Sequence, residues 1–98
     1  MVEVLSKSDR AGALARLKDW HETDRGKAIA KTFAFDDFNA AFGFMARVAL
    51  VAEKMDHHPD WSNSYDKVAV TLSTHSAGGV TSSDIRLAEA MDEIAGSS

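Results

Sequence analysis

The sequence predicts an α+β fold, a two-layer domain with helices on one face of a four-stranded antiparallel sheet. Three observations lead to this prediction. Helical and alternating apolar patterns follow one another in the order helix, two strands, helix, two strands, helix. A short turn separates the strands of each pair, as antiparallel neighbours allow. At 98 residues the chain is too short to divide into two cores, so we expect a single domain over 1–98.

The N-terminal third of the chain predicts a short helix followed by a β-hairpin. Ser6 is the expected N-cap of this helix, which ends near Trp20. Two extended segments, 20–24 and 27–35, flank a turn in which Gly26 suits the tight backbone. On the second segment, alternate apolar residues share one face: Ile29, Phe33 and Phe35.

The longest predicted helix begins at Asp36-Asp37 and is ended by Pro59. Two neighbouring apolar stripes run along it. The first contains Phe38, Phe42, Met45, Ala49 and Ala52, and the second contains Phe44, Val48, Val51 and Met55. Together they cover roughly half of the circumference, which is wider than one core face needs. Either the helix lies deep in its own core, or the second stripe meets another subunit, and the pattern leaves both open.

A second hairpin and a last helix complete the predicted fold. The hairpin strands are 62–65 and 68–75, with a turn at Asp66-Lys67. One face of the latter strand carries Val68, Val70, Leu72 and Thr74, and the other carries Ala69, Thr71, Ser73 and His75. Thr81 and Asp84 form a capping box for the last helix. Its apolar positions are Ile85, Ala88, Met91 and Ala95.

Composition excludes several classes of protein. The chain has no cysteine, so disulfides and thiolate metal sites are excluded. A net charge of -4 argues against binding to nucleic acid, which needs a basic surface. No apolar run approaches the ~20 residues of a membrane span. Because the N-terminus is acidic and lacks the basic start of a signal peptide, we expect a cytoplasmic protein.

Three of the four histidines stand where side chains reach a cleft. His57 and His58 follow the end of the long helix, and His75 ends a strand on the side opposite its apolar face. Imidazole titrates near neutrality, so a cluster of such groups suits a reaction that moves protons. His21, on the first hairpin, receives no role.

Two other interpretations of the histidines remain. Adjacent histidines in a loop are most often solvated surface residues, and a lone histidine at a strand end usually makes a surface hydrogen bond. Three histidines can also hold a metal ion. However, adjacent residues on an extended chain point apart, and no HxH or HxxxH pair is present to form the usual chelate. We therefore assign no metal ligands.

The central part of the chain resembles the pterin-4a-carbinolamine dehydratase family. The resemblance rests on the runs 38–50 and 52–61, on Tyr65-Asp66-Lys67-Val68, and on Thr71-Leu72-Ser73-Thr74-His75. It is looser in the N-terminal part, yet it covers nearly the whole chain. The sequence departs from the family at 76–79 and at 21–23.

The resemblance implies a 4a-hydroxytetrahydropterin dehydratase that needs no cofactor. Such an enzyme eliminates water from the pterin product of aromatic amino acid hydroxylases, giving quinonoid dihydropterin in tetrahydrobiopterin recycling. By position, the implied catalytic and substrate-orienting residues are His57, His58 and His75. The implied substrate pocket also includes Asp56, Ser73, Thr74, Ser76 and Trp61, the last as a wall for the pterin ring. Glu53 and Asp84 are the implied partners that orient or polarise the histidines.

The resemblance also implies partners. It implies a homotetramer, built as a dimer of dimers, and a functional coupling to an aromatic amino acid hydroxylase. Composition predicts no direct contact with nucleic acid or membrane. Animal members additionally bind a homeodomain transcription factor as a dimerisation cofactor. A non-enzymatic protein-binding module of this kind is the alternative to the dehydratase.

Overall fold

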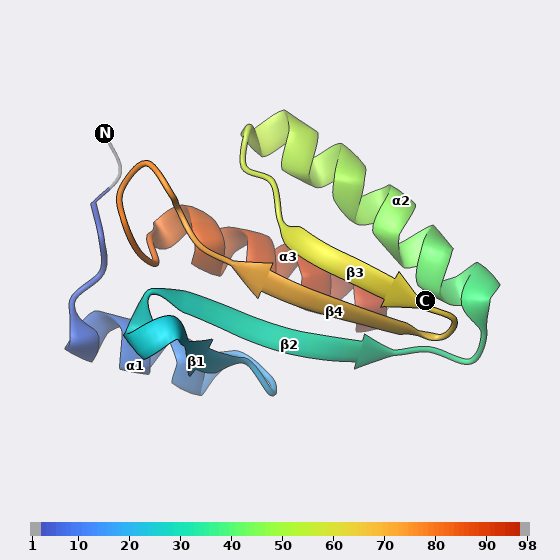
Figure 1. Ribbon diagram of the computed structural model, residues 1–98, viewed down its shortest axis with the longest axis horizontal. Helices are drawn as coiled ribbons and strands as arrows, with labels where there is room; N and C mark the ends of the chain where they lie inside the picture. Colours follow the sequence, from blue (N-terminus) through green and yellow to red (C-terminus); the bar gives the residue numbers. More distant parts are fainter. Residues whose placement is uncertain (1–2, 97–98) are drawn as a thin grey trace.

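The protein has the element order that the sequence predicts. The computed structural model describes residues 3–96, so both ends of the expected 1–98 domain lie outside the described residues. The elements are α1 (Lys7–Arg16), β1 (His21–Thr23), β2 (Ala28–Ala34), α2 (Phe38–Met55), β3 (Asp60–Ser64), β4 (Lys67–Leu72) and α3 (Ser82–Gly96). The strands form one antiparallel sheet in the order β1-β2-β4-β3. The helices lie on one side of this sheet, with α3 behind β3 and β4 in Figure 1, which confirms the α+β class.

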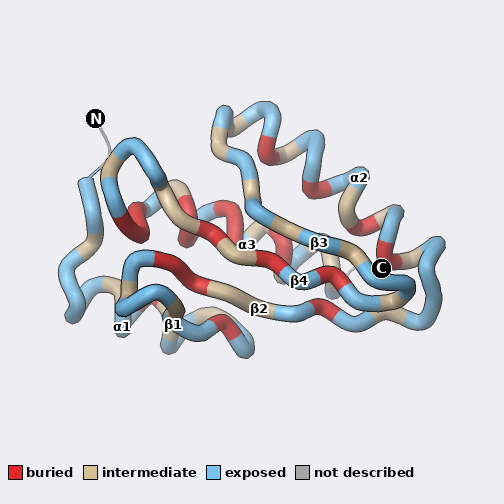
Figure 2. Tube along the Cα trace, viewed as in Figure 1, coloured by how far each residue is buried: buried red, intermediate tan, exposed pale blue. Residues whose placement is uncertain are grey.

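The core lies between the sheet and the helices. On β4, Val68, Val70 and Leu72 are buried, whereas the residues between them face the open side of the sheet. Phe33 on β2 packs against Phe44 of α2, with ring centroids 4.7 Å apart. Figure 2 shows buried positions recurring along α2 and α3 on the sides that face this layer. Within residues 3–96, no helix has the length and apolar character that crossing a membrane requires.

The orientation of α2 buries Ala52 of the first predicted stripe together with Phe44 and Val48 of the second. Phe44 and Val48, from the second stripe, are fully buried inside the chain. Of the two alternatives that the pattern left open, these residues support the one in which the helix lies in its own core. Phe38 and Phe42, from the first stripe, are instead 49% and 58% exposed. The cause is non-local, because Phe44 packs against Phe33 of β2 and against Phe35 just after it, which leaves Phe38 and Phe42 on the outer side of the helix.

Several element ends differ from those predicted. The first helix ends at Arg16, before Trp20, whose buried ring donates from Nε1 to Asp92 Oδ1 on α3. The first turn is a 3-10 turn in which Gly26 has a φ of 83°, as its glycine suggested. The third strand begins at Asp60, two residues earlier than expected. The second hairpin turns at Tyr65 and Asp66, and not at Asp66-Lys67, because Lys67 already pairs in the sheet.

The fourth strand ends earlier than predicted, and this moves His75. The strand stops at Leu72, and Thr74 then exchanges backbone hydrogen bonds with Gly79 at 2.9 and 3.4 Å. Residues 75–78 form the closed turn between them. His75 therefore lies on a turn that leaves the sheet, and not at a strand end.

Candidate active site

Asp56 ends α2 and fixes the backbone from which His57 extends. Its backbone is left-handed, with φ 54° and ψ 42°, and its N–H donates to the carbonyls of the last helical turn. The N–H of His57 donates to the Ala52 carbonyl oxygen at 3.1 Å. Aspartate tolerates this conformation better than most residues other than glycine. The helix end thus carries His57 away in one defined direction.

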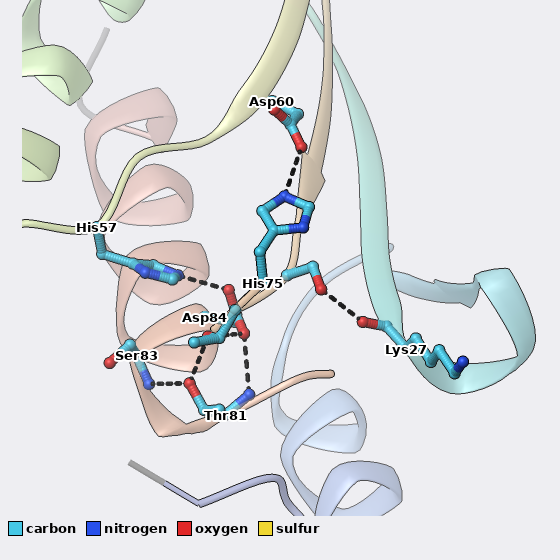
Figure 3. Close-up of polar contacts among 9 residues, drawn as sticks. Lys27, His57, Asp60, His75, Thr81, Ser83 and Asp84 are labelled. Atoms are coloured by element: carbon cyan, nitrogen blue, oxygen red, sulfur yellow. Dashed lines mark hydrogen bonds and ion pairs between the residues drawn. The ribbon is translucent and has the colours of Figure 1, made fainter. Parts of the chain in front are cut away.

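Asp84, in the first turn of α3, is the carboxylate that meets His57. His57 Nε2 lies 2.6 Å from Asp84 Oδ1, and the Asp84 side chain is fully buried whereas that of His57 is 13% exposed. The other carboxylate oxygen accepts hydrogen bonds from the Thr81 N–H at 2.9 Å and the Thr74 hydroxyl at 2.8 Å (Figure 3). The Thr81 contact confirms one half of the predicted capping box, whereas the Thr81 hydroxyl accepts from the Ser83 N–H and not from that of Asp84. One carboxylate therefore both caps α3 and holds His57.

His57 lies in the wall of a cavity of about 440 Å³ between the end of α2, the 73–79 turn and the start of α3. This volume is within the range of small-molecule sites. The lining residues are Met55, Asp56, His57, Thr74, Ser76, Ala77 and Ser83. The lining combines three hydroxyls, one carboxylate and one imidazole with the apolar side chains of Met55 and Ala77. Such a mixed lining suits a ligand that has apolar faces and several hydrogen-bonding groups.

His75 faces a different cavity, on the open side of the sheet. Its ring points away from Asp84 and toward Asp60, with His75 Nε2 3.4 Å from Asp60 Oδ2 (Figure 3). This cavity measures about 310 Å³ and is lined by Thr23, Asp24, Lys27, Ala28, Asp60, Thr71, Ser73, His75 and Gly78. Residues of the turn after β4 are divided between the two cavities. His57 therefore faces the cavity on one side of this turn, and His75 faces the cavity on the other side.

The other residues singled out from the sequence lie outside both cavities. His58 Nε2 is 2.8 Å from Glu53 Oε1, and both side chains are largely exposed. Trp61 lies on the helix side of the sheet, opposite Val70, and packs against the core. The expected role of Trp61 as a wall of the pocket therefore has no support in this geometry. His21 is exposed on β1.

Sequence reasoning missed two residues that the structure adds to the site. Thr81 was recognised only as a helix cap, yet its hydroxyl lies 2.7 Å from that of Thr74. Asp60 was not singled out, although it is the carboxylate nearest to His75. The hairpin register places Asp60 opposite Thr71, near the end of β4. If the first strand of the predicted hairpin had been extended back to Asp60, its pairing would have placed Asp60 near the end of β4 and near His75.

The three histidines share one chemical arrangement. Each has a carboxylate at Nε2: Asp84 for His57, Glu53 for His58 and Asp60 for His75. Within residues 3–96, no group of three or more histidine, cysteine, aspartate or glutamate side chains is placed to hold a metal ion. Histidines paired with carboxylates next to a polar cavity are suited to proton transfer. Fold and site together define a small α+β protein with a candidate acid–base site for a polar ligand.

The chain belongs to the pterin-4a-carbinolamine dehydratase family. The family model described as "Pterin 4 alpha carbinolamine dehydratase" matches residues 3–94. A protein of Bradyrhizobium sp. strain BTAi1, named "Putative pterin-4-alpha-carbinolamine dehydratase", is 62% identical over 97 residues, covering 99% of this chain and 98% of that protein. One of the same name from Nitrobacter hamburgensis is 61% identical over 95 residues, covering 97% of this chain and 94% of that protein.

Solved structures of other proteins are similar to this fold. One is a transcriptional coactivator/pterin dehydratase from Brucella melitensis, with a TM-score of 0.92 and 50% identity over 95% of this chain and 99% of that chain. Another is described as a pterin dehydratase-like protein that is a RuBisCO assembly factor in the α-carboxysome. It has a TM-score of 0.70 and 26% identity over 83% of this chain and 94% of that chain. Structures similar to this one thus include a protein named for an enzyme activity and a protein named for assembly.

Proposed function

We propose that this protein eliminates water from a 4a-hydroxytetrahydropterin to give quinonoid dihydropterin, in the recycling of tetrahydrobiopterin. The observation that carries the proposal is the pairing of His57 with buried Asp84 at the wall of a hydroxyl-lined cavity, in a chain of this family. The whole chain, 1–98, acts as one domain in the cytoplasm, and the pterin comes from an aromatic amino acid hydroxylase.

The reaction needs two proton transfers and no change of oxidation state. The bond between C4a and the hydroxyl oxygen breaks, the oxygen receives a proton and leaves as water, and the N5 proton departs as N5 and C4a form a double bond. A general acid and a general base meet both needs. We assign these roles to His57 and His75, and we assign to His58 the holding of the substrate.

The surrounding residues supply support for these roles. Asp84 orients His57 from a fully buried position, and Glu53 contacts His58. Hydrogen bonds to the substrate come from the polar residues around the 73–79 turn, namely Asp56, Ser73, Thr74 and Ser76. Of these, Asp56, Thr74 and Ser76 line the cavity of His57, whereas Ser73 lines that of His75.

The test is the rate of dehydration of synthetic 4a-hydroxytetrahydropterin, followed by absorbance with and without the protein. The substrate also dehydrates spontaneously, so the proposal requires a rate above this background that rises in proportion to protein concentration. A protein that leaves the spontaneous rate unchanged at every concentration is not a dehydratase.

Chelation provides a separate prediction. We expect dialysis against EDTA to leave the dehydration rate unchanged, because the assigned proton transfers use side chains alone. Parallel assays of dialysed protein with and without added zinc form the comparison. Activity that is lost on dialysis and returns with zinc would assign a metal-dependent mechanism instead.

The alternative function is a non-enzymatic protein-binding module, such as the dimerisation cofactor of a transcription factor. The names of two similar structures, a transcriptional coactivator/pterin dehydratase and a RuBisCO assembly factor, support this alternative. So does the exposed apolar surface of α2, which includes Phe38 and Phe42. The dehydration assay separates the two functions, because only an enzyme exceeds the spontaneous rate.

We also propose that the protein assembles into a homotetramer, as a dimer of dimers, through the exposed residues of the first apolar stripe of α2. Phe38 and Phe42 lie one turn apart with ring centroids separated by 5.8 Å, and Ala49 continues the stripe two turns later. Large apolar side chains grouped on one helix face are typical of protein contacts. The assembly is carried by this stripe, and not by Phe44 and Val48.

A charge in this stripe should weaken the assembly. We expect Phe42→Glu to shift the protein toward smaller species at micromolar concentration, because the carboxylate must lose its water without gaining a partner. Size exclusion with light scattering measures the shift. Ala15→Glu adds the same charge to an exposed position of α1 and should leave the mass unchanged. A wild-type protein that runs as a monomer would remove the assembly proposal.

A further inference from the structure

Behind His57 lies a closed network of hydrogen bonds that involves two threonines. Asp84 Oδ1 faces His57, and Asp84 Oδ2 accepts from Thr81 N–H and from the Thr74 hydroxyl. The two threonine hydroxyls lie 2.7 Å apart, and the Thr81 hydroxyl oxygen accepts from the Ser83 N–H at 3.3 Å. Figure 3 shows the network on the side of Asp84 away from solvent-exposed His75. Thr81 and Asp84 are both fully buried.

The direction of each hydroxyl proton follows from counting donors. A threonine hydroxyl has one proton to donate. The proton of Thr74 is donated to Asp84, so the contact between the hydroxyls uses the proton of Thr81. Thr81 therefore donates to Thr74, and Thr74 donates to Asp84. Chains of hydrogen bonds aligned in this way strengthen one another in a buried setting.

The same count determines the role of His57. Asp84 lies in the first turn of α3, where the helix favours a negative charge. Two further donors already point at its Oδ2 atom. An ionised carboxylate only accepts hydrogen bonds. The proton between Asp84 Oδ1 and His57 Nε2 then belongs to the imidazole, which leaves Nδ1 as the nitrogen free to exchange a proton.

We propose that Thr81 and Thr74 are positioning residues that, through Asp84, hold neutral His57 in the tautomer protonated at Nε2. If the proposed dehydratase function holds, Nδ1 is then the atom of His57 that exchanges a proton with the pterin. Thr81 does not itself line the cavity, and it reaches His57 only through Thr74 and Asp84. Its role is to keep the hydrogen-bond donors on Asp84 Oδ2, so that Asp84 Oδ1 remains to accept from His57.

The tautomer can be measured directly by the imidazole ¹⁵N shifts of labelled protein without substrate. At a pH of about 8, where an unperturbed imidazole is neutral, His57 should show a protonated Nε2 and an unprotonated Nδ1. A His57→Asn variant assigns its signals among those of the four histidines. A wild-type His57 that is protonated at Nδ1 in its neutral form would overturn the proposal.

Variants at Thr81 test the link to the network. Thr81→Val keeps the shape and the backbone N–H that donates to Asp84, but it removes the hydroxyl that fixes the direction of the Thr74 hydroxyl. The Thr74 proton can then turn away from Asp84 Oδ2, so we expect His57 to show a mixture of tautomers. We expect the dehydration rate to fall about tenfold to a hundredfold, the range known for partners that orient metal-bound histidines. Thr81→Ser keeps the hydroxyl and should restore both the single tautomer and most of the rate. A Thr81→Val protein with an unchanged tautomer, or a serine variant without recovery, would contradict the positioning role.

Loss of a helix cap is the competing explanation, because Thr81 precedes α3. Ser6→Ala is the matched control, since it removes a hydroxyl that caps α1 by accepting from the Asp9 N–H at 3.0 Å. It should lower stability without changing the His57 tautomer. The measurement without substrate also separates the two proposals. A protein with protonated Nε2 but no activity would support the positioning role and contradict the dehydratase function. A protein with activity but protonated Nδ1 would support the dehydratase function and contradict the positioning role.

Discussion

We expect His57→Ala and His75→Ala each to lower the dehydration rate by about 10²-fold or more, the scale of one acid–base group. For His57 the reason is its place between the cavity and buried Asp84. For His75 the reason is its contact with Asp60 on the other side of the turn. The measurement is the initial rate over the spontaneous background, with folding of each variant checked by thermal unfolding.

His21→Ala is the control for these two variants. His21 is exposed on β1 and lines neither cavity, so its removal should change the rate little. An equal loss in all three variants would mean that the wrong histidines have been assigned. A loss in His57→Ala alone would assign both proton transfers to the cavity at the end of α2. The control therefore tests which histidines are catalytic. The comparison of His57→Ala with His75→Ala tests whether the two proton transfers are shared between them.

The order of elements and the faces of the strands could be predicted from the sequence, because they depend on local periodicity. The alternation over Val68, Val70 and Leu72 indicates both a strand and its buried face. The end of β4 could not be predicted in this way. It depends on Thr74 pairing with Gly79 across a closed turn, and alternation in the sequence continues past it.

The candidate site was predictable to the extent that its signals are local or shared with the family. The capping box indicated the contact between Thr81 and Asp84 within one helical turn. The partner of His57 lies 27 residues away, and only the resemblance suggested that Asp84 belongs near it. Spacing gave no indication that His57 and His75 would face different cavities, because that follows from the tight turn after β4.

The burial of Val48 leads to a second large effect. We expect Val48→Glu to destabilise the chain by about 3–5 kcal/mol, as expected for a charge left buried without a partner. Val48 is fully buried on the inner face of α2, and domains of this size are stable by only about 5–15 kcal/mol. Chemical denaturation of wild type and variant measures the difference in the free energy of unfolding.

Leu50→Glu is the matched control for Val48→Glu, because it places the same charge two residues further along α2 at a side chain that is 74% exposed. We expect it to change the free energy of unfolding by less than about 0.5 kcal/mol, as surface substitutions usually do. Loss of an internal contact weakens each chain at any concentration, whereas loss of a contact between chains depends on protein concentration. A destabilisation by Val48→Glu that vanishes in dilute protein would therefore show that Val48 contacts another subunit. A constant loss assigns it to the core and leaves Phe38 and Phe42 to carry the assembly.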